Sequence, residues 1–165
     1  MTIEEKIAWA EDCLASHGAL LLSDPKLGQL LEAFKGARAA SHLEMQKAGI
    51  GEICHKCETQ GGGSCCGAGI EQRYDQWILV ANLLLGVSIP KSRWNRDSCL
   101  FLGPEGCVLL ARHTICVDYL CKDLVNQVDP RCISRLREKE GKELELLFFI
   151  CERINEVIKE GEQAR

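Results

Sequence analysis

Eight cysteines crowd the middle of the chain, and their thiols are the side chains best able to do chemistry. The chain has 165 residues and 11 cysteines. The eight lie between positions 54 and 121: Cys54, Cys57, Cys65, Cys66, Cys99, Cys107, Cys116 and Cys121. Thiols at this density, in a chain whose N-terminus shows no export signal, bind a metal more often than they form disulfides. We therefore interpret these eight as metal ligands.

The spacing of the first four cysteines matches no common metal motif. Cys54 and Cys57 form a C-x2-C knuckle, in which two sulfurs converge on one ion. A zinc ribbon needs a second such knuckle, but the next pair is the adjacent Cys65 and Cys66, whose side chains tend to point apart. The adjacent pair therefore binds two sites, or separate irons of one cluster, or supplies one ligand and one spare thiol. The cysteine spacings do not match the common ferredoxin patterns, so they assign no cluster type.

The histidines and the other cysteines define the limits of the candidate site. His55 lies inside the knuckle and His113 lies shortly before the last pair of cysteines, so either could replace a cysteine as ligand. Cys13 and Cys151 lie on apolar helical stripes, which favours buried core thiols, and Cys132 is left out of the ligand set. The sequence has no Ser-His-Asp order, phosphate loop or His-Glu-x-x-His helix.

The order of the cysteines also resembles a known family. The residues that carry the resemblance are Cys54-x2-Cys57, Cys65-Cys66-Gly67, Cys99-Leu100-Phe101-Leu102 with Gly106-Cys107, and Arg112-x3-Cys116-x4-Cys121. This order resembles the zinc- or iron-chelating cysteine-cluster family (YkgJ-like) over residues 54 to 121. The resemblance implies a metal or iron–sulfur centre, and some related proteins, including flagellin lysine methylases, use such a region in enzymes. The chain departs from the family at the wide gap after Cys57, at His113 and at Val117.

Helices are predicted on the N-terminal side of this region, where they would support it. Thr2 and Glu5 form a capping box, and apolar residues at helical spacing follow as far as Gly18. A second helix begins at Asp24-Pro25, because aspartate caps a helix and proline suits its first turn, and it ends near Gly49. Residues 1–49 are therefore expected to form a helical support.

The cysteine-rich region 50–121 is predicted to contain loop, one helix and one hairpin. Periodicity vanishes over residues 50–69, where the three glycines 61–63 would allow sharp turns and aim backbone N–H groups at thiolates. A helix near 70–86 follows, and its positive N-terminus would favour thiolate at Cys65 and Cys66. Two short apolar runs with a turn between them would then hold Cys99 close to Cys107.

The remaining residues, 122–165, are assigned to C-terminal helices. Thr114 is expected to cap a helix through about Asn126, with Cys116 in its first turn. Cys116 and Cys121 would then point about 140° apart, unless the helix is interrupted. Asp129-Pro130 begins a long amphipathic helix, with a break expected at Gly141.

Size and composition limit the fold and the partners. A chain of 165 residues has the size of a single domain, 1–165. We expect it to be mainly α, a helical bundle wrapped around a cysteine-rich, metal-stabilised irregular region with at most a short β-hairpin. Lys and Arg number 20 against 24 Asp and Glu, a formal net charge of −4, which disfavours nucleic acid as a partner. No apolar run reaches membrane-spanning length, so we expect no membrane partner and a cytoplasmic location.

Three functions fit these features. The first is a cytoplasmic metal-binding protein that holds an iron–sulfur cluster or iron, for electron transfer, for sensing or as a cofactor module. The second is a structural Zn²⁺ protein whose helices bind a protein partner. The third is a thiol-dependent redox or methyl-transfer enzyme, with Cys66 or Cys116 as the first candidates for the reactive thiol. Colour, sulfide content and alkylation of a free thiol would distinguish the three.

Overall fold

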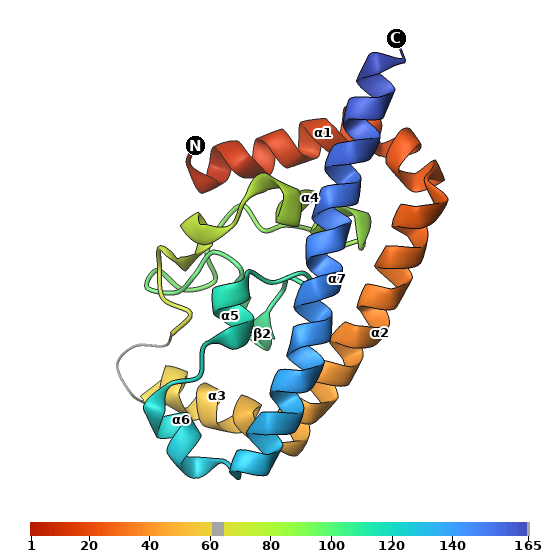
Figure 1. Ribbon diagram of the computed structural model, residues 1–165. Helices are drawn as coiled ribbons and strands as arrows, with labels where there is room; N and C mark the ends of the chain where they lie inside the picture. Colours follow the sequence, from red (N-terminus) through yellow and green to blue (C-terminus); the bar gives the residue numbers. More distant parts are fainter. Residues whose placement is uncertain (61–64, 165) are drawn as a thin grey trace.

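Two long helices run side by side and form the frame of the molecule (Figure 1). In the computed structural model, which describes residues 1–60 and 65–164, α2 (Pro25–Lys47) packs along α7 (Pro130–Gln163). At one end of this pair, α1 (Ile3–Ser23) packs against α4 (Gln76–Leu84) and α7. At the other end, α3 (Ile50–Gln60) packs against α6 (Lys122–Gln127).

Short elements of the cysteine-rich region lie between these two ends (Figure 1). They are a 3₁₀ turn, η1 (Ile70–Arg73), two strands, β1 (Leu102–Gly103) and β2 (Gly106–Cys107), and the helix α5 (Thr114–Asp118), which packs against α7. The strands are antiparallel, with Leu102 opposite Cys107. Gly106 has φ +116°, a conformation that glycine adopts without steric cost. The protein is thus mainly helical, as predicted, and the short hairpin lies where the sequence places it.

Two separate clusters of buried apolar side chains hold these elements together. The larger joins α1, α2, α4, α7 and the segment around the hairpin, and its largest fully buried side chains include Phe34, Tyr74 and Phe101. The smaller lies where α3, α6 and the start of α7 meet, and its buried members are Ile50, Leu124, Val128 and Leu136. Because each buried side chain of this size contributes about 1.5–3 kcal/mol, the α3–α6 end has much less hydrophobic stabilisation than the frame.

The predicted N-terminal helix is confirmed, and it is longer than expected. The capping box is formed, since the backbone N–H of Thr2 donates to Glu5 Oε2 at 2.6 Å. The helix continues past the expected end at Gly18 to Ser23. The reason is Leu21, which is 1 % exposed in the larger cluster and holds the last turn against the core.

The long C-terminal helix is also confirmed, and the expected break at Gly141 is wrong, because α7 is continuous from Pro130 to Gln163. A helical glycine costs about 1 kcal/mol relative to alanine, which the packing of α7 along α2 outweighs. Cys13 is buried and Cys151 packs against the larger cluster, as their apolar stripes predict. No helix of the described residues is long and apolar enough to cross a membrane.

The predicted loop over 50–69 is wrong in its first half, which forms α3. Gly49, with φ +70°, turns the chain between α2 and α3, and Ile50 is 3 % exposed in the smaller cluster. The sequence does carry a helix signal here, since Ile50, Ile53, Cys54 and Cys57 recur at helical spacing, and the helix packs against α6. The three glycines 61–63 lie outside the described residues.

The single helix predicted near 70–86 is in fact two elements. The turn η1 ends at Arg73, and α4 begins only at Gln76. Asp75 separates them because its carboxylate accepts the backbone N–H of Ile78 at 2.9 Å and caps α4.

Candidate metal centre

The eight candidate ligands come from several separate segments of the fold. Two are on α3, two precede η1, one precedes the hairpin, one is in strand β2, one is in the first turn of α5 and one caps α6: Cys54, Cys57, Cys65, Cys66, Cys99, Cys107, Cys116 and Cys121. All eleven cysteines of the chain lie in the described ranges, and no disulfide links any two of them. None of these cysteines is therefore prevented by a disulfide from binding a metal.

Four of these cysteines gather at the α3–α6 end, and we call Cys54, Cys57, Cys65 and Cys121 the first group. Contacts between α3 and α6 bring the knuckle toward Cys121, which packs on the smaller cluster together with Ile53. Desolvation raises the pKa of Cys54, and negative charge at Cys65, Cys121 and Cys57 raises it further. Desolvation and the charges of Cys121 and Cys57 likewise raise the pKa of Cys65. The contacts between α3 and α6 and these electrostatic influences place the four thiols in the same region of the fold.

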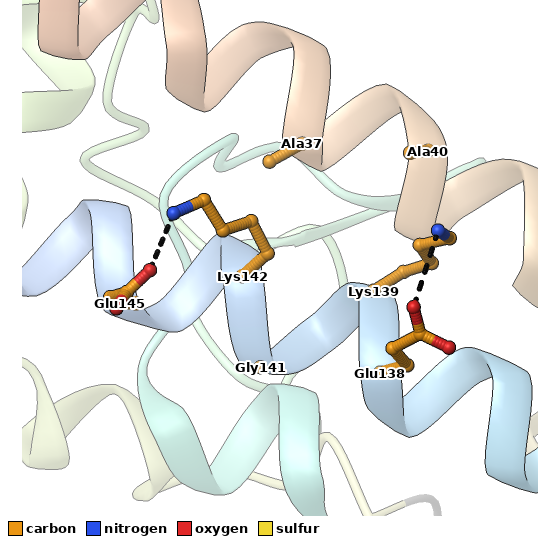
Figure 2. A pocket seen from close by; sticks show the side chains of 7 residues that line it. All are labelled: Ala37, Ala40, Glu138, Lys139, Gly141, Lys142 and Glu145. Carbon is orange, nitrogen blue, oxygen red and sulfur yellow. Dashed lines mark hydrogen bonds and ion pairs between the residues drawn. The ribbon is translucent and has the colours of Figure 1, made fainter.

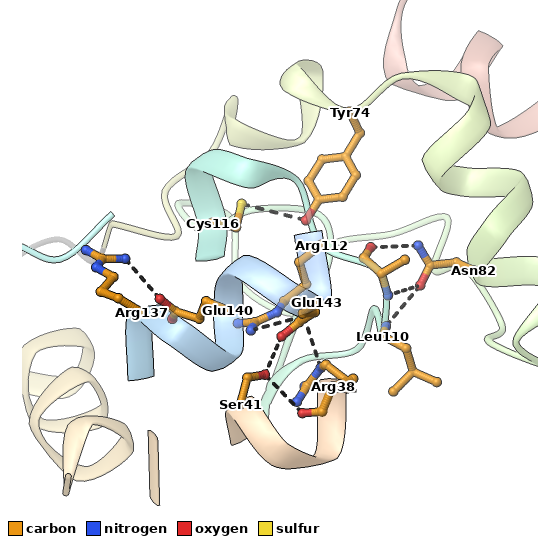
Figure 3. A network of polar contacts seen from close by, with 11 residues as sticks. Arg38, Ser41, Tyr74, Asn82, Leu110, Arg112, Cys116, Arg137, Glu140 and Glu143 are labelled. Carbon is orange, nitrogen blue, oxygen red and sulfur yellow. Dashed lines mark hydrogen bonds and ion pairs between the residues drawn. The ribbon is translucent and has the colours of Figure 1, made fainter. Parts of the chain in front are cut away.

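A further three cysteines gather around the hairpin and α5. Burial raises the pKa of Cys99 to about 12, and Glu71, Cys107 and Cys116 raise it as well. The Tyr74 hydroxyl donates to Cys116 Sγ at 3.6 Å, as Figure 3 shows. Burial and the charges of Cys107 and Cys116 raise the pKa of that hydroxyl. Cys99, Cys107 and Cys116 are therefore neighbours too.

Cys66 is joined to this second set through its backbone. Its carbonyl accepts the N–H of Cys99 at 2.7 Å. The next residues continue the pairing, since Gly67 forms an antiparallel bridge with Ser98 and the N–H of Ala68 donates to Asp97 at 2.9 Å. We call Cys66, Cys99, Cys107 and Cys116 the second group.

A buried carboxylate that the sequence did not indicate fixes this pairing. Glu71 is 1 % exposed, forms an ion pair with Arg93 and accepts the N–H groups of Gly69 and Leu100. Burial by itself would raise the pKa of Glu71, but the guanidinium of Arg93 and the backbone donors hold it at about 2. Glu71 therefore ties the segment after Cys66 to the segment after Cys99.

Asn82 fixes the segment that leads from the hairpin to α5 (Figure 3). It is fully buried, donates to the carbonyls of Ile78 and Ala111 at 2.9 and 2.8 Å, and accepts the N–H groups of Leu110 and Ala111 at 2.9 and 3.0 Å. The sequence does carry a signal for this role of Asn82, because a polar residue inside an apolar helix is buried, and a buried amide must be hydrogen-bonded.

Two arginines share one buried carboxylate beside Cys107. In Figure 3, Arg38 of α2 and Arg112 point toward Glu143 of α7. Arg38 Nε and Arg112 Nη2 each lie 3.9 Å from Glu143 Oε1, and the Ser41 hydroxyl donates to the other oxygen. Desolvation raises the pKa of Cys107, whereas Arg112 and Arg38 lower it. The two cations and one anion leave excess positive charge next to the second group.

The histidines are placed differently from the cysteines. His113 Nδ1 accepts the N–H of Ile115 at 3.2 Å and caps α5, so the predicted cap at Thr114 is wrong by one residue. The predicted helix through Asn126 is interrupted between α5 and α6. His55 is exposed on α3, one position after Cys54. Residues one position apart do not face the same side of a helix, whereas residues three apart do, so Cys54 and Cys57 share a side that His55 does not.

The expected influence of a helix N-terminus on Cys65 and Cys66 is wrong. The first α-helix after this pair is α4, which begins at Gln76. The dipole of a helix acts within its first turn, and the pKa of Cys65 is raised by desolvation rather than lowered. Backbone pairing with residues 97–99 takes the place of the helix in positioning this pair.

The residues fit a metal in donor type. Each group offers four thiols, and thiolate is the ligand preferred by zinc and by iron–sulfur clusters. Among residues 1–60 and 65–164, no three His, Cys, Asp or Glu side chains are grouped so that they could hold an ion. The sulfurs would therefore have to turn toward a shared ion as it binds.

A hollow between α2 and α7 lies on another part of the surface (Figure 2). It is lined by Ala37, Ala40, Glu138, Lys139, Gly141, Lys142 and Glu145. Lys142 pairs with Glu145 at 2.6 Å and Lys139 with Glu138 at 3.8 Å, so the cations are neutralised within the hollow. It contains no cysteine, and we assign it no part in the metal chemistry.

Comparisons with known proteins identify no relative. No family model matches the chain, no curated protein matches it, and no solved structure matches it. The resemblance to the cysteine-cluster family stays a prediction from the order of the cysteines.

Proposed function

We propose that the protein is a metal-binding protein that holds an iron–sulfur or iron centre through its clustered cysteines. The observation that supports this proposal is that distant segments bring cysteines to the same parts of the fold: α3, which carries Cys54 and Cys57, contacts α6, which begins after Cys121, and the backbone of Cys66 is hydrogen-bonded to Cys99. Neighbouring thiolates repel one another in the absence of a cation. A metal ion removes that repulsion by sharing their charge, and its binding stabilises the folded site.

The surroundings of the second group support a cluster that transfers electrons, senses, or serves a larger assembly as a cofactor module. Hydrogen bonds to sulfur, nearby charge and burial set the potential of an iron–sulfur cluster. The Tyr74 hydroxyl donates to Cys116 Sγ, the guanidiniums of Arg38 and Arg112 act on Cys107, and Cys99 is 5 % exposed. These groups supply all three influences.

The α3–α6 end favours zinc as the alternative. Only four side chains are buried in the smaller cluster, so this end needs stabilisation beyond its own packing. Structural zinc contributes about 10–16 kcal/mol to folding in small metal-dependent domains. A zinc ion held by the first group would order α3 and α6, and the helices would then serve a protein partner.

Raised pKa values weigh against three of the thiols as catalytic nucleophiles. A nucleophilic cysteine needs a lowered pKa, because the thiolate is the reactive form. Desolvation and neighbouring thiols raise the pKa of Cys54, Cys65 and Cys99 instead. As metal ligands they would lose their protons to solvent when the cation binds, because the cation stabilises the thiolate.

Anaerobic purification with metal analysis tests the proposal. We expect iron and acid-labile sulfide in the protein, with absorption in the visible range. Stoichiometric zinc without sulfide would establish the zinc alternative, and a chain that takes up neither iron nor zinc would overturn both. Replacing the core thiol Cys13 by Ala is the matched control, because Cys13 lies in the larger cluster and should leave the metal content unchanged.

A further inference from the structure

Two adjacent phenylalanines are exposed on the surface of α7. Phe148 is 60 % and Phe149 46 % exposed, and their ring centroids are 5.6 Å apart. Phe149 follows Lys142 by seven residues and Glu145 by four in a continuous helix, so it lies on the side of α7 that lines the hollow beside α2. Phe148, one residue earlier, points about 100° away from Phe149 around the helix. Aromatic side chains are enriched at protein interfaces, so Phe149 and the hollow together are a candidate interface.

The hollow is large enough to receive an aromatic side chain. Its volume is about 610 Å³, and small residues line it, Ala37 and Ala40 from α2 and Gly141 from α7 (Figure 2). A Cβ atom on Gly141 would come within 4 Å of no side chain of the described residues beyond its chain neighbours. The space above Gly141 is therefore open to a ring from another molecule.

The charges around the hollow indicate which molecule that is. Two lysines, Lys139 and Lys142, and two glutamates, Glu138 and Glu145, line it, and each of these four side chains is 45–75 % exposed. A surface with a net charge repels a copy of itself, whereas a surface with equal numbers of both charges can pair with its own copy. A second copy of the chain therefore fits this surface in charge.

Two copies of this surface also match in register about a two-fold axis. Such an axis brings the same patch of both subunits together, and the two α7 helices then run antiparallel. With the axis halfway between Lys142 and Glu145, Lys142 lies opposite the partner's Glu145. Phe149 is four residues beyond Glu145, and Glu138 is four residues before Lys142. The same register therefore places Phe149 opposite the partner's Glu138, at the end of the hollow where Ala40 lies (Figure 2).

We propose that Phe149 and the hollow between α2 and α7 form a dimer face that joins two copies of the chain. One symmetry operation forms two Lys142–Glu145 pairs and inserts each Phe149 ring into the partner's hollow. The face covers about three turns of α7, so the dimer is weak and reversible, as small interfaces are. This inference goes beyond the proposed function, and it does not depend on a bound metal.

Sedimentation velocity of the full-length chain tests the dimer face. The protein is kept reduced, so that no disulfide joins two copies, and its concentration is varied from roughly 5 to 500 μM. We expect the mean mass to rise from one chain toward two. Phe149→Ala should weaken dimerisation at least about tenfold, because aromatic anchors carry much of the binding free energy at interfaces. Phe148→Ala is the matched control, and it should dimerise like wild type.

Charge reversals test the register of the two helices. Lys142→Glu puts glutamate opposite glutamate and Glu145→Lys puts lysine opposite lysine, so each variant alone should dimerise at least about tenfold more weakly than wild type. An equimolar mixture of the two variants should dimerise like wild type, because every contact then joins opposite charges. Glu32→Lys and Lys35→Glu are the controls, since they reverse an exposed ion pair of α2, 2.6 Å long, that lies outside the hollow. Each of them should dimerise like wild type.

Two outcomes would overturn the dimer face. In the first, wild type sediments as a monomer at every concentration, and the surface would then have to serve a different protein. In the second, a dimer forms that Phe149→Ala and both charge reversals at the hollow leave unchanged. Far-UV circular dichroism checks that each variant keeps its helices. A chain that dimerises as expected but takes up no metal would overturn the proposed function alone.

Discussion

Under the proposed function, protons and a metal ion compete for the sulfur of each cysteine. Burial and neighbouring negative charge raise the pKa of Cys54, Cys65 and Cys99, so these groups hold protons at neutral pH when no cation is near. Under the proposed function, a metal ion must displace those protons, and we expect metal binding to release protons and to strengthen as pH rises. The positive charge of Arg38 and Arg112 reduces this cost at Cys107.

Glu71 provides a prediction at the same scale. Replacing it with Gln keeps the size of the side chain and removes the ion pair with Arg93. The pKa of Glu71 is about 2 in the folded chain, against 4.5 for an unperturbed glutamate. The carboxylate thus contributes about 3 kcal/mol to the free energy of unfolding, fully present above about pH 4.5 and lost as pH falls toward 2. Urea denaturation of wild type and Glu71→Gln should differ by about this amount at pH 7.

The pH dependence of the stability difference between wild type and Glu71→Gln shows whether the loss comes from the ion pair or from disturbed packing. The difference between the two proteins should shrink steadily between about pH 4.5 and 2.5, because wild-type Glu71 becomes protonated as the pH approaches its folded-state pKa. Glu105→Gln, at an exposed position in the hairpin turn, is the control and should unfold like wild type. A difference that stays constant with pH would contradict the role given to Glu71.

Elements with strong local signals could be predicted from the sequence, and those fixed by distant contacts could not. The capping box at Thr2, Asp24-Pro25 and the apolar stripe of α7 each act within a few residues, and all three mark real helix starts or faces. The hairpin follows from its glycine-containing turn. Helix α3 shows both effects: Ile50, Ile53, Cys54 and Cys57 recur at helical spacing within its 11 residues, but its place in the fold depends on the burial of Ile50 against α6 and α7.

For the candidate site, too, the sequence predicts what depends on residue type and does not predict what depends on long-range contacts. Residue type and density sufficed to select the eight thiols as candidate ligands. Their neighbours depend on which elements meet, and the approach of α3 to α6 is a contact between residues far apart in sequence. The roles of Glu71 and Asn82 also depend on partners elsewhere in the chain: on Arg93 and Leu100 for the first, and on Ala111 for the second.

The packing of α3 on α6 gives a prediction at the scale of elements. Leu124 is 2 % exposed in the smaller cluster, and Leu124→Ala should cost about 2–4 kcal/mol. Because that cluster is small, we expect the cost to appear as local opening of α3 and α6. Hydrogen exchange should therefore speed up in residues 50–60 and 122–127 and stay slow in α2.

The same truncation in the larger cluster is the control for this experiment. Leu27 of α2 is fully buried there, and Leu27→Ala should lower the stability of the frame without a selective effect on α3. Under the proposed function, metal held by the first group should be lost in Leu124→Ala and kept in Leu27→Ala. Equal exchange in α3 for the two variants would show that the clusters do not unfold independently.

The whole molecule combines a frame packed on the larger cluster, which also holds α4 and the hairpin segment, with an α3–α6 end that lacks a comparable core. Arg153 of α7 donates to both oxygens of Asp24, at 3.1 and 2.7 Å, while the same carboxylate caps α2 through the N–H of Leu27. This contact joins the end of α1, the start of α2 and the middle of α7. The frame is thus held by packing and by this ion pair, and the cysteine-rich region is attached to it.

Metal removal should therefore loosen one part of the molecule and leave the other folded. After chelation under reducing conditions, we expect the far-UV helical signal to fall by roughly a quarter at most, the share of helical residues in α3, η1, α5 and α6. Hydrogen exchange should become fast in these elements and stay slow in α1, α2 and α7, since Phe34, Ile150 and Ile154 remain buried between them. The double variant Cys57→Ser, Cys107→Ser, which should hold little metal from the start, should show no further change with chelator. Complete loss of helical signal on chelation would mean that the frame itself depends on the metal, which the two-cluster arrangement does not allow.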